Sequence, residues 1–155
     1  MEALSLPDHG VKTKHGAEGS TVFDPVRRRR VALTPEEWVR QHVINYLLHD
    51  LGCPASLMGV EAGLVLNGMA KRADIVVYDR SASPVLLVEC KAPGVPLAQA
   101  TFEQVALYNL VPKVRYLLVT NGNSHYCCVV DHQRGGVEFL PTLPPFDAMI
   151  TGVGR

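Results

Sequence analysis

Two acidic residues and a lysine lie at the ends of two short apolar segments of this sequence. Asp74 opens the apolar run 75–78, and Glu89 and Lys91 directly follow the run 85–88. A polar, turn-rich segment separates the runs, which is typical of a β-hairpin. In an antiparallel pair the start of one strand lies beside the end of the other, and strand alternation points Glu89 and Lys91 the same way. The sequence therefore predicts two carboxylates and an ammonium group at one end of a sheet.

Such a cluster suits a hard divalent cation. Two carboxylates and a backbone carbonyl match the ligands of Mg²⁺, which keeps several waters when it binds to proteins. A lysine beside the metal can orient or deprotonate a bound water, as phosphodiester hydrolysis requires. The alternative is a solvated hairpin end with one ion pair, because Glu-x-Lys is a common pattern.

A helix is expected upstream of the hairpin. Thr34 can cap its first turn, Pro35 suits the first helical position, and Glu37 completes a capping box. Apolar residues recur at helical spacing until the expected end near Gly52. Glu37 is therefore either a cap or a third acid for the cluster.

Four consecutive arginines occupy positions 27–30. One interpretation is an exposed segment that keeps the chain in solution. The other is a strip that binds phosphate, because the guanidinium group matches phosphate in a bidentate fork.

The remaining pattern predicts an α/β domain with a central mixed sheet flanked by helices. Strands are expected at 56–66, 115–120 and 125–131, with a short strand near 137–140. A helix at about 98–110 crosses between the strands of Glu89 and residue 117, which makes that pair parallel. We expect a flexible arm at 1–20, a single domain at 21–140 and an irregular tail at 141–155.

Composition limits the other classes of function. The 155 residues carry no net charge, so any affinity for polyanions must come from a local patch. The four cysteines lack the spacing of a zinc site, and free thiols in a reducing compartment are expected. We find no signal peptide and no apolar run that could span a membrane. The expected location is the cytoplasm, with no membrane partner.

Five segments together resemble the PD-(D/E)XK nuclease superfamily, and more narrowly the N-terminal nuclease domain of type I restriction enzyme R subunits. The resemblance covers about residues 34–131 and rests on PEEWVRQ, KRADIVVYD, LLVECKAPG, FEQVALYN and YLLVTNG. It implies a restriction-endonuclease-like core. One departure is Ala73, which stands where the family often has proline.

The resemblance implies a role for several individual residues. Asp74 and Glu89 match the two acids that hold Mg²⁺, with Mn²⁺ as a substitute and the carbonyl of Cys90 as a further ligand. Lys91 matches the lysine that positions the attacking water. Glu37 resembles the helix-borne glutamate that assists the metal, with Glu36 as the competing choice. Gln104 and Tyr108 match a Q-x-x-x-Y element that positions the substrate.

The function implied is Mg²⁺-dependent hydrolysis of DNA phosphodiester bonds. The phosphate backbone would be held by residues 27–30, Arg28 and Arg29 among them, and by residues 71–72, including Arg72. Cutting both strands from one site per chain favours a homodimer. The sequence contains no P-loop, so the chain is either free-standing or served by motor or specificity subunits on other chains. The alternatives are an inert DNA-binding or assembly module of the same fold, or a nuclease with a different substrate.

Overall fold

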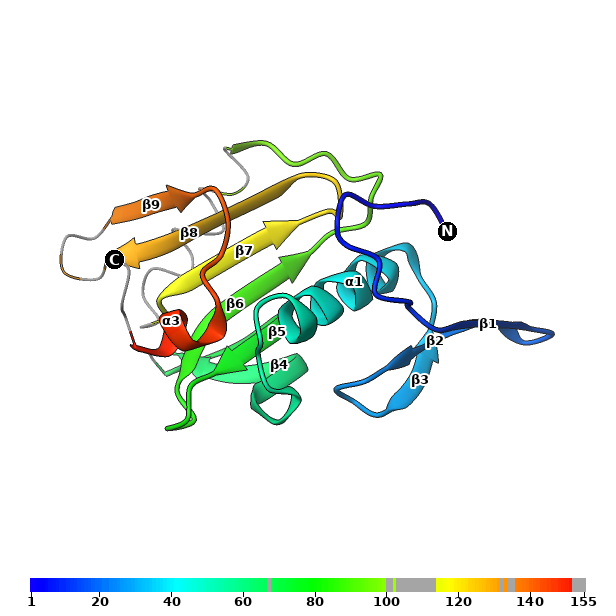
Figure 1. The fold of residues 1–155 in the computed structure, drawn as a ribbon, viewed down its shortest axis with the longest axis horizontal. Coiled ribbons are helices and arrows are strands. Elements are labelled where there is room, and N and C mark those ends of the chain that lie inside the picture. Colours follow the sequence, from blue (N-terminus) through cyan, green and yellow to red (C-terminus); the bar gives the residue numbers. More distant parts are fainter. Residues whose placement is uncertain (67, 100–101, 103–113, 132, 134–135, 152–155) are drawn as a thin grey trace.

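A six-stranded sheet forms the body of the molecule (Figure 1). The structure is a computed structural model that describes residues 1–155 except 67, 100–101, 103–113, 132, 134–135 and 152–155. The strands lie in sequence order: β4 (Met58–Leu66), β5 (Met69–Tyr78), β6 (Pro84–Cys90), β7 (Tyr116–Thr120), β8 (His125–Asp131) and β9 (Gly136–Leu140). The β6–β7 pair is parallel and the other neighbouring pairs are antiparallel. The predicted α/β class with a mixed sheet is confirmed.

The hairpin formed by β5 and β6 carries the predicted cluster. Ile75 is paired with Val88, and the strands continue antiparallel from there to the turn. Their apolar residues are almost completely buried because the sheet is covered on both faces by hydrophobic clusters. This burial fixes the register, since a slip of one residue would turn every side chain to the opposite face.

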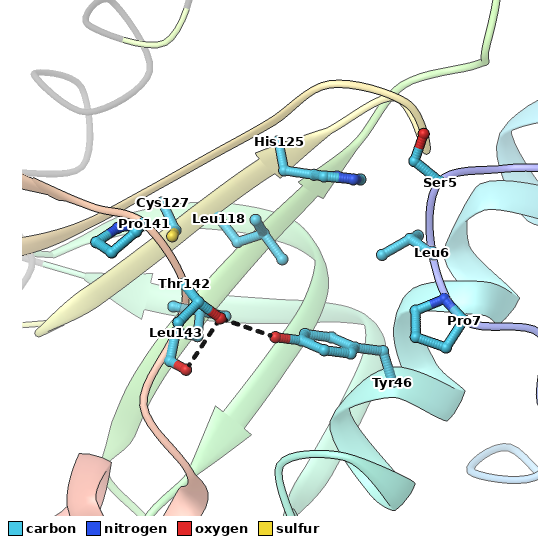
Figure 2. Close-up of a pocket in the computed structure, with 10 residues that line it drawn as sticks. All are labelled: Ser5, Leu6, Pro7, Tyr46, Leu118, His125, Cys127, Pro141, Thr142 and Leu143. Carbon is cyan, nitrogen blue, oxygen red and sulfur yellow. Dashed lines mark hydrogen bonds between the residues drawn. The ribbon is translucent and has the colours of Figure 1, made fainter.

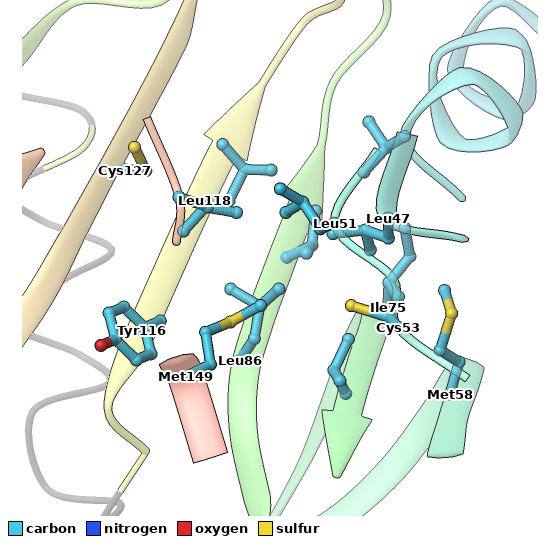
Figure 3. Close-up of a cluster of buried hydrophobic side chains, with 14 of the residues drawn as sticks. Leu47, Leu51, Cys53, Met58, Ile75, Leu86, Tyr116, Leu118, Cys127 and Met149 are labelled. Carbon is cyan, nitrogen blue, oxygen red and sulfur yellow. The ribbon is translucent and has the colours of Figure 1, made fainter. Parts of the chain in front are cut away.

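Helix α1 (Pro35–His49) packs across one face of the sheet (Figure 1). It starts as the sequence predicts, because the Thr34 side chain accepts a hydrogen bond of 3.0 Å from the Glu37 backbone N–H. Its buried apolar residues join the core over the sheet with others from β5, β6 and β7, several of which are labelled in Figure 3. A short 3-10 helix, η1 (Ala55–Leu57), leads from α1 into β4.

The C-terminal segment differs from the irregular tail expected at 141–155. Helix α3 (Phe146–Thr151) buries Phe146 and Met149 in the same core as α1. The backbone N–H of Phe146 also donates to the carbonyl of Leu51. A helix of six residues is too short to show an apolar period in the sequence, so this element could not be recognised there.

The N-terminal segment also differs from the flexible arm expected at 1–20. A second sheet contains β1 (Thr13–Gly16), β2 (Gly19–Asp24) and β3 (Arg29–Ala32), in that order. Before it, Leu4 and Leu6 pack against the core, and the Ser5 N–H donates to the carbonyl of Gly122. Two leucines among polar residues are enough to attach this segment to the body, although its composition resembles a loop.

The structure also bears on the predictions made for the cysteines, for membrane-spanning helices and for Gln104 and Tyr108. All four cysteines are free and buried, as expected. Within the described part of the chain, no helix is long and apolar enough to cross a membrane. Gln104 and Tyr108 lie outside the described residues, so their predicted role stays a prediction.

Candidate active site

Asp74 and Glu89 lie side by side at the end of the hairpin. Asp74 directly precedes Ile75 and Glu89 directly follows Val88, and these two neighbours are paired across the antiparallel strands. One carboxylate oxygen of Asp74, Oδ2, accepts a hydrogen bond of 2.8 Å from the Cys90 N–H, which ties the middle of β5 to the end of β6. The structure therefore brings the two predicted acids together where β6 ends beside β5, although β5 begins at Met69 and Asp74 does not open the strand as expected.

The two carboxyl groups perturb each other. Burial, the negative charge of Asp74 and a hydrogen bond with Asp74 together raise the pKa of Glu89 to about 7, from an ordinary 4.5. The positive charge of Lys91 acts in the opposite direction but is too weak to compensate. The raised pKa means that Glu89 binds a proton more readily than an exposed glutamate does, because its charged form is poorly solvated and lies beside a second acid.

Lys91 and Cys90 point to different environments, as strand alternation predicts. The Cys90 side chain lies in the core beneath α1, where burial raises the pKa of its thiol well above the ordinary value. Lys91 is half-buried, and its backbone N–H donates to the carbonyl of Thr120 on β7. The positive charge of Lys91 acts to lower the pKa of Glu89, so its ammonium group is near enough to influence that carboxyl.

Arg40 of α1 is a buried partner of Asp74 that sequence reasoning missed. Its Nη2 lies 2.9 Å from Asp74 Oδ1 and 3.0 Å from Glu36 Oε1, and its side chain is only 5% exposed. Burial alone would lower the pKa of Arg40, but the hydrogen bond to Asp74 and the charges of Glu37 and Asp74 raise it. The guanidinium group therefore stays charged and fixes the orientation of the Asp74 carboxylate.

Glu36 and Glu37 face different neighbours, although both contact Arg40. Glu37 is buried, and both of its oxygens lie 2.9 Å from Nη2 of Arg27. Glu36 has a side chain that is 46% exposed, and its charge contributes to the raised pKa of Glu89. Of the two glutamates, Glu36 thus lies on the side of the acidic pair, whereas Glu37 connects α1 to the smaller sheet.

The arginine run is divided between the interior and the surface. Arg27 binds Asp24 at 2.6 Å and Glu37 at 2.9 Å, so it cannot contribute to the exposed strip proposed for residues 27–30. Arg28 and Arg29 are exposed and remain available to a ligand. Arg72 is also exposed, at 72% of its side chain, close to the acidic pair in sequence and on the same strand as Asp74.

Glu61 is a second residue that the sequence did not indicate. It lies on β4, where the pairing with β5 passes from Val60–Ile75 to Ala62–Ala73, so that Glu61 falls opposite Asp74. Its φ of 52° is unusual for a residue with a side chain and costs on the order of 1 kcal/mol. Strain of this kind is common beside functional sites.

The two carboxylates are ligands of the kind that a hard divalent cation such as Mg²⁺ takes. Asp74 and Glu89 offer two carboxylates whose mutual repulsion a divalent cation would relieve. In the part of the chain that the structure describes, no group of three or more His, Cys, Asp or Glu side chains forms a metal cage. Two carboxylates completed by a backbone carbonyl and water are characteristic of Mg²⁺, which rarely binds in all-protein cages.

A cavity of about 190 Å³ lies away from these residues, and none of them lines it. Figure 2 shows its walls, which come from the N-terminal segment, α1, β7, β8 and the segment before α3. One wall contains Tyr46, whose hydroxyl lies 3.3 Å from that of Thr142. His125 forms another, and burial lowers its pKa. This cavity is thus separate from the acidic pair.

Comparison with known proteins decides the family. A family described as "Type I restriction enzyme R protein N terminus (HSDR_N)" matches residues 35–144, which is most of the chain. The chain belongs to this family. The matched segment contains every residue of the acidic pair and its surroundings on α1, β4, β5 and β6. No curated protein matches the chain.

Two solved structures are similar to this restriction enzyme R N-terminal domain. A fragment of a proposed HsdR subunit of a type I restriction enzyme from Vibrio vulnificus YJ016 has 20% identity and a TM-score of 0.52. The match covers 77% of this chain and 25% of that chain, so the chain spans a quarter of that relative's length. A proposed nuclease belonging to DUF820 from Anabaena variabilis ATCC 29413 has 9% identity and a TM-score of 0.49, with coverage of 96% and 88%. The predicted relationship to restriction enzyme R subunits is confirmed.

Proposed function

We propose that this domain hydrolyses DNA phosphodiester bonds with the help of Mg²⁺ or Mn²⁺. The observation that carries the proposal is the placement of Glu89 beside Asp74, where burial and the neighbouring acid together raise the pKa of Glu89 to about 7. A chain gains no stability from two carboxylates that repel each other, whereas a metal site requires them. Membership of a restriction enzyme family supports DNA as the substrate.

Each residue of the site has a role that its position supports. Asp74 and Glu89 would hold the metal, with the Cys90 carbonyl as a third ligand, and the metal would activate water and stabilise the developing charge on phosphate. Lys91 would hold the attacking water beside Glu89 and offset charge on the pentacovalent phosphorus. Arg40 would orient Asp74 through its hydrogen bond of 2.9 Å to that carboxylate, as a positioning residue.

Further residues complete the proposal. Glu36 would bind the metal through water, because it lies on the side of the acidic pair. Arg28, Arg29 and Arg72 would contact phosphates, with affinity that depends on salt and little on sequence. We also propose a homodimer for cutting both strands, and association with other subunits, since the family is named for one subunit of a restriction enzyme.

Nicking of a supercoiled plasmid tests the hydrolysis. We expect nicking by the native chain with Mg²⁺ and none with EDTA. Asp74→Asn and Lys91→Ala should abolish nicking while retaining the circular dichroism spectrum. Glu138→Gln is the matched control, because this exposed carboxylate lies on β9, outside the site. Nicking that survives in both site variants would exclude this site.

A second function, an inert DNA-binding or assembly module, is favoured by one contact. Arg40 already neutralises Asp74, so the site retains one cation without any metal. An inert module would show DNA binding by the native chain but no nicking with Mg²⁺ or Mn²⁺, and no metal binding that depends on Asp74.

A further inference from the structure

The positive charge of this chain is concentrated in the smaller sheet. Residues 11–32 contain six lysines and arginines against two acids, although the whole chain has no net charge. Of these, Arg27 and Asp24 neutralise each other in the interior. The remaining acid is Glu18 in the β1–β2 turn, so the surface of this sheet is cationic and the rest of the molecule is acidic.

The strand register places three of these cations, Lys12, Lys14 and Arg30, on one face of the sheet. Lys12 and Phe23 are joined by a backbone hydrogen bond, and Phe23 is paired with Arg30. Lys14 is paired with Thr21, two residues before Phe23, and therefore projects from the same face. The opposite face carries the buried side chain of Val22, so the cationic face points to solvent.

This face is ordered before any ligand arrives. Arg30 donates from Nε to Thr21 Oγ1 at 3.0 Å and from Nη2 to the Lys12 carbonyl at 3.3 Å. The turn before it is fixed by Asp24, whose Oδ1 accepts from the backbone N–H groups of residues 26 and 27. Ordering in advance reduces the entropy that a ligand would otherwise have to remove.

Arg28 has a backbone conformation that its residue type does not favour. Its φ of 57° lies in the left-handed region, which costs a side-chain-bearing residue about 1–2 kcal/mol. Glycine or asparagine would tolerate this turn more easily. An exposed arginine at such a position is better explained by a ligand for its charge than by the turn itself.

The position of the β1–β2 hairpin would allow it to bind a DNA duplex that also reaches the acidic pair. In Figure 1 the β1–β2 hairpin extends from the body beyond the N-terminal end of α1. A chain of ion pairs leads from its base to the acidic pair: Arg27 to Glu37 at 2.9 Å, Glu37 to Arg40 at 2.7 Å and Arg40 to Asp74 at 2.9 Å. A two-stranded ribbon of this kind fits the major groove of DNA.

We propose that the β1–β2–β3 sheet is a clamp for the phosphate backbone of double-stranded DNA, through Lys12, Lys14 and Arg30 on its cationic face and Arg28 in the turn beside them. The proposal deepens the proposed function, because it names the surface that holds the substrate while the acids act. Phosphate contacts of this kind fix the position of the duplex without reading its sequence. The exposed edge of Phe23 would pack against sugar.

Binding can be measured apart from cleavage. We would titrate a short fluorescein-labelled duplex with the full chain in EDTA and follow anisotropy at several NaCl concentrations. The triple variant Lys12→Gln/Lys14→Gln/Arg28→Gln should weaken binding and reduce the slope of log K against log[salt] by about three, one per lost phosphate contact. Arg80→Gln, an exposed cation in the β5–β6 turn, is the control and should change neither quantity.

The outcomes separate this surface from the catalytic proposal. An unchanged slope in the triple variant would overturn the clamp, and so would an equal loss in Arg80→Gln. Weaker binding by the triple variant alone supports the clamp, even if the native chain does not nick plasmid with Mg²⁺. In that case only the proposed hydrolysis fails. The circular dichroism spectrum of the triple variant should match the native spectrum, since all three side chains lie on the surface.

Discussion

Replacing Glu89 by glutamine should make the metal-free protein more stable at alkaline pH. Burial and Asp74 raise the pKa of Glu89 to about 7, so the folded chain holds a proton between pH 4.5 and 7 that the unfolded chain has lost. The contribution of Glu89 to stability is therefore full below pH 4.5 and falls as the pH rises to 7. Glutamine resembles the protonated form and is insensitive to pH.

The size of the effect follows from the same pKa. One pKa unit corresponds to about 1.4 kcal/mol, and water around the half-buried carboxyl screens part of the interaction. We expect the free energy of unfolding of Glu89→Gln to be higher than that of the native chain by on the order of 1–2 kcal/mol at pH 8. At pH 4.5 the two free energies should be equal. For a chain of this length, the difference at pH 8 raises Tm by about 2–8 °C.

Thermal unfolding in EDTA at several pH values would measure this difference. His125 acts in the opposite direction, because burial lowers its pKa and its contribution grows as the pH rises through the ordinary range of histidine. Both proteins contain His125, so the difference between them isolates Glu89. Parallel changes in the two Tm values between pH 4.5 and 8, or a variant less stable at pH 8, would refute the raised pKa of Glu89.

Three further predictions follow from the same contacts. Glu37→Gln should lower the free energy of unfolding, measured in urea, by about 3–5 kcal/mol, because two buried arginines lose their charged partner. Glu36→Gln should lower it by less than about 1 kcal/mol, but should weaken Mn²⁺ binding. Arg40→Lys should retain the fold but weaken Mn²⁺ binding, because an ammonium group cannot reproduce the guanidinium fork that orients Asp74; an unchanged affinity would contradict a positioning role. Phe146→Ala should cost about 3–5 kcal/mol by calorimetry; a loss below 1 kcal/mol would show that α3 does not support the core.

Much of the sheet could be predicted because strands alternate and turns are local. The β5–β6 hairpin follows from two apolar runs and a polar break, and the meeting of Asp74 with Glu89 follows from the hairpin. The parallel pairing of β6 with β7 follows from the length of the connection between them. These inferences need only neighbouring residues and the handedness of crossovers.

The contacts that support the site are long-range and could not be predicted. Choosing between Glu36 and Glu37 requires the rotation of α1 against the sheet, and one residue turns a helix by about 100°. The burial of Arg27 depends on Asp24 and on a helix ten residues away, so the arginine run looked uniform in the sequence. Nothing in the sequence indicates the left-handed backbone conformation of Glu61, because glutamate rarely adopts it.

Titration of the native chain with Mn²⁺ by calorimetry at pH 8 tests the central claim most directly, with Asp74→Asn as the comparison. We expect one Mn²⁺ site in the native chain and no binding by the variant. Repeating the native titration at pH values from 8 down to 7 should show increasing proton release, because Glu89 must ionise before it can bind the metal. A native chain that binds no Mn²⁺, or a variant that binds it equally well, would contradict a metal site between Asp74 and Glu89.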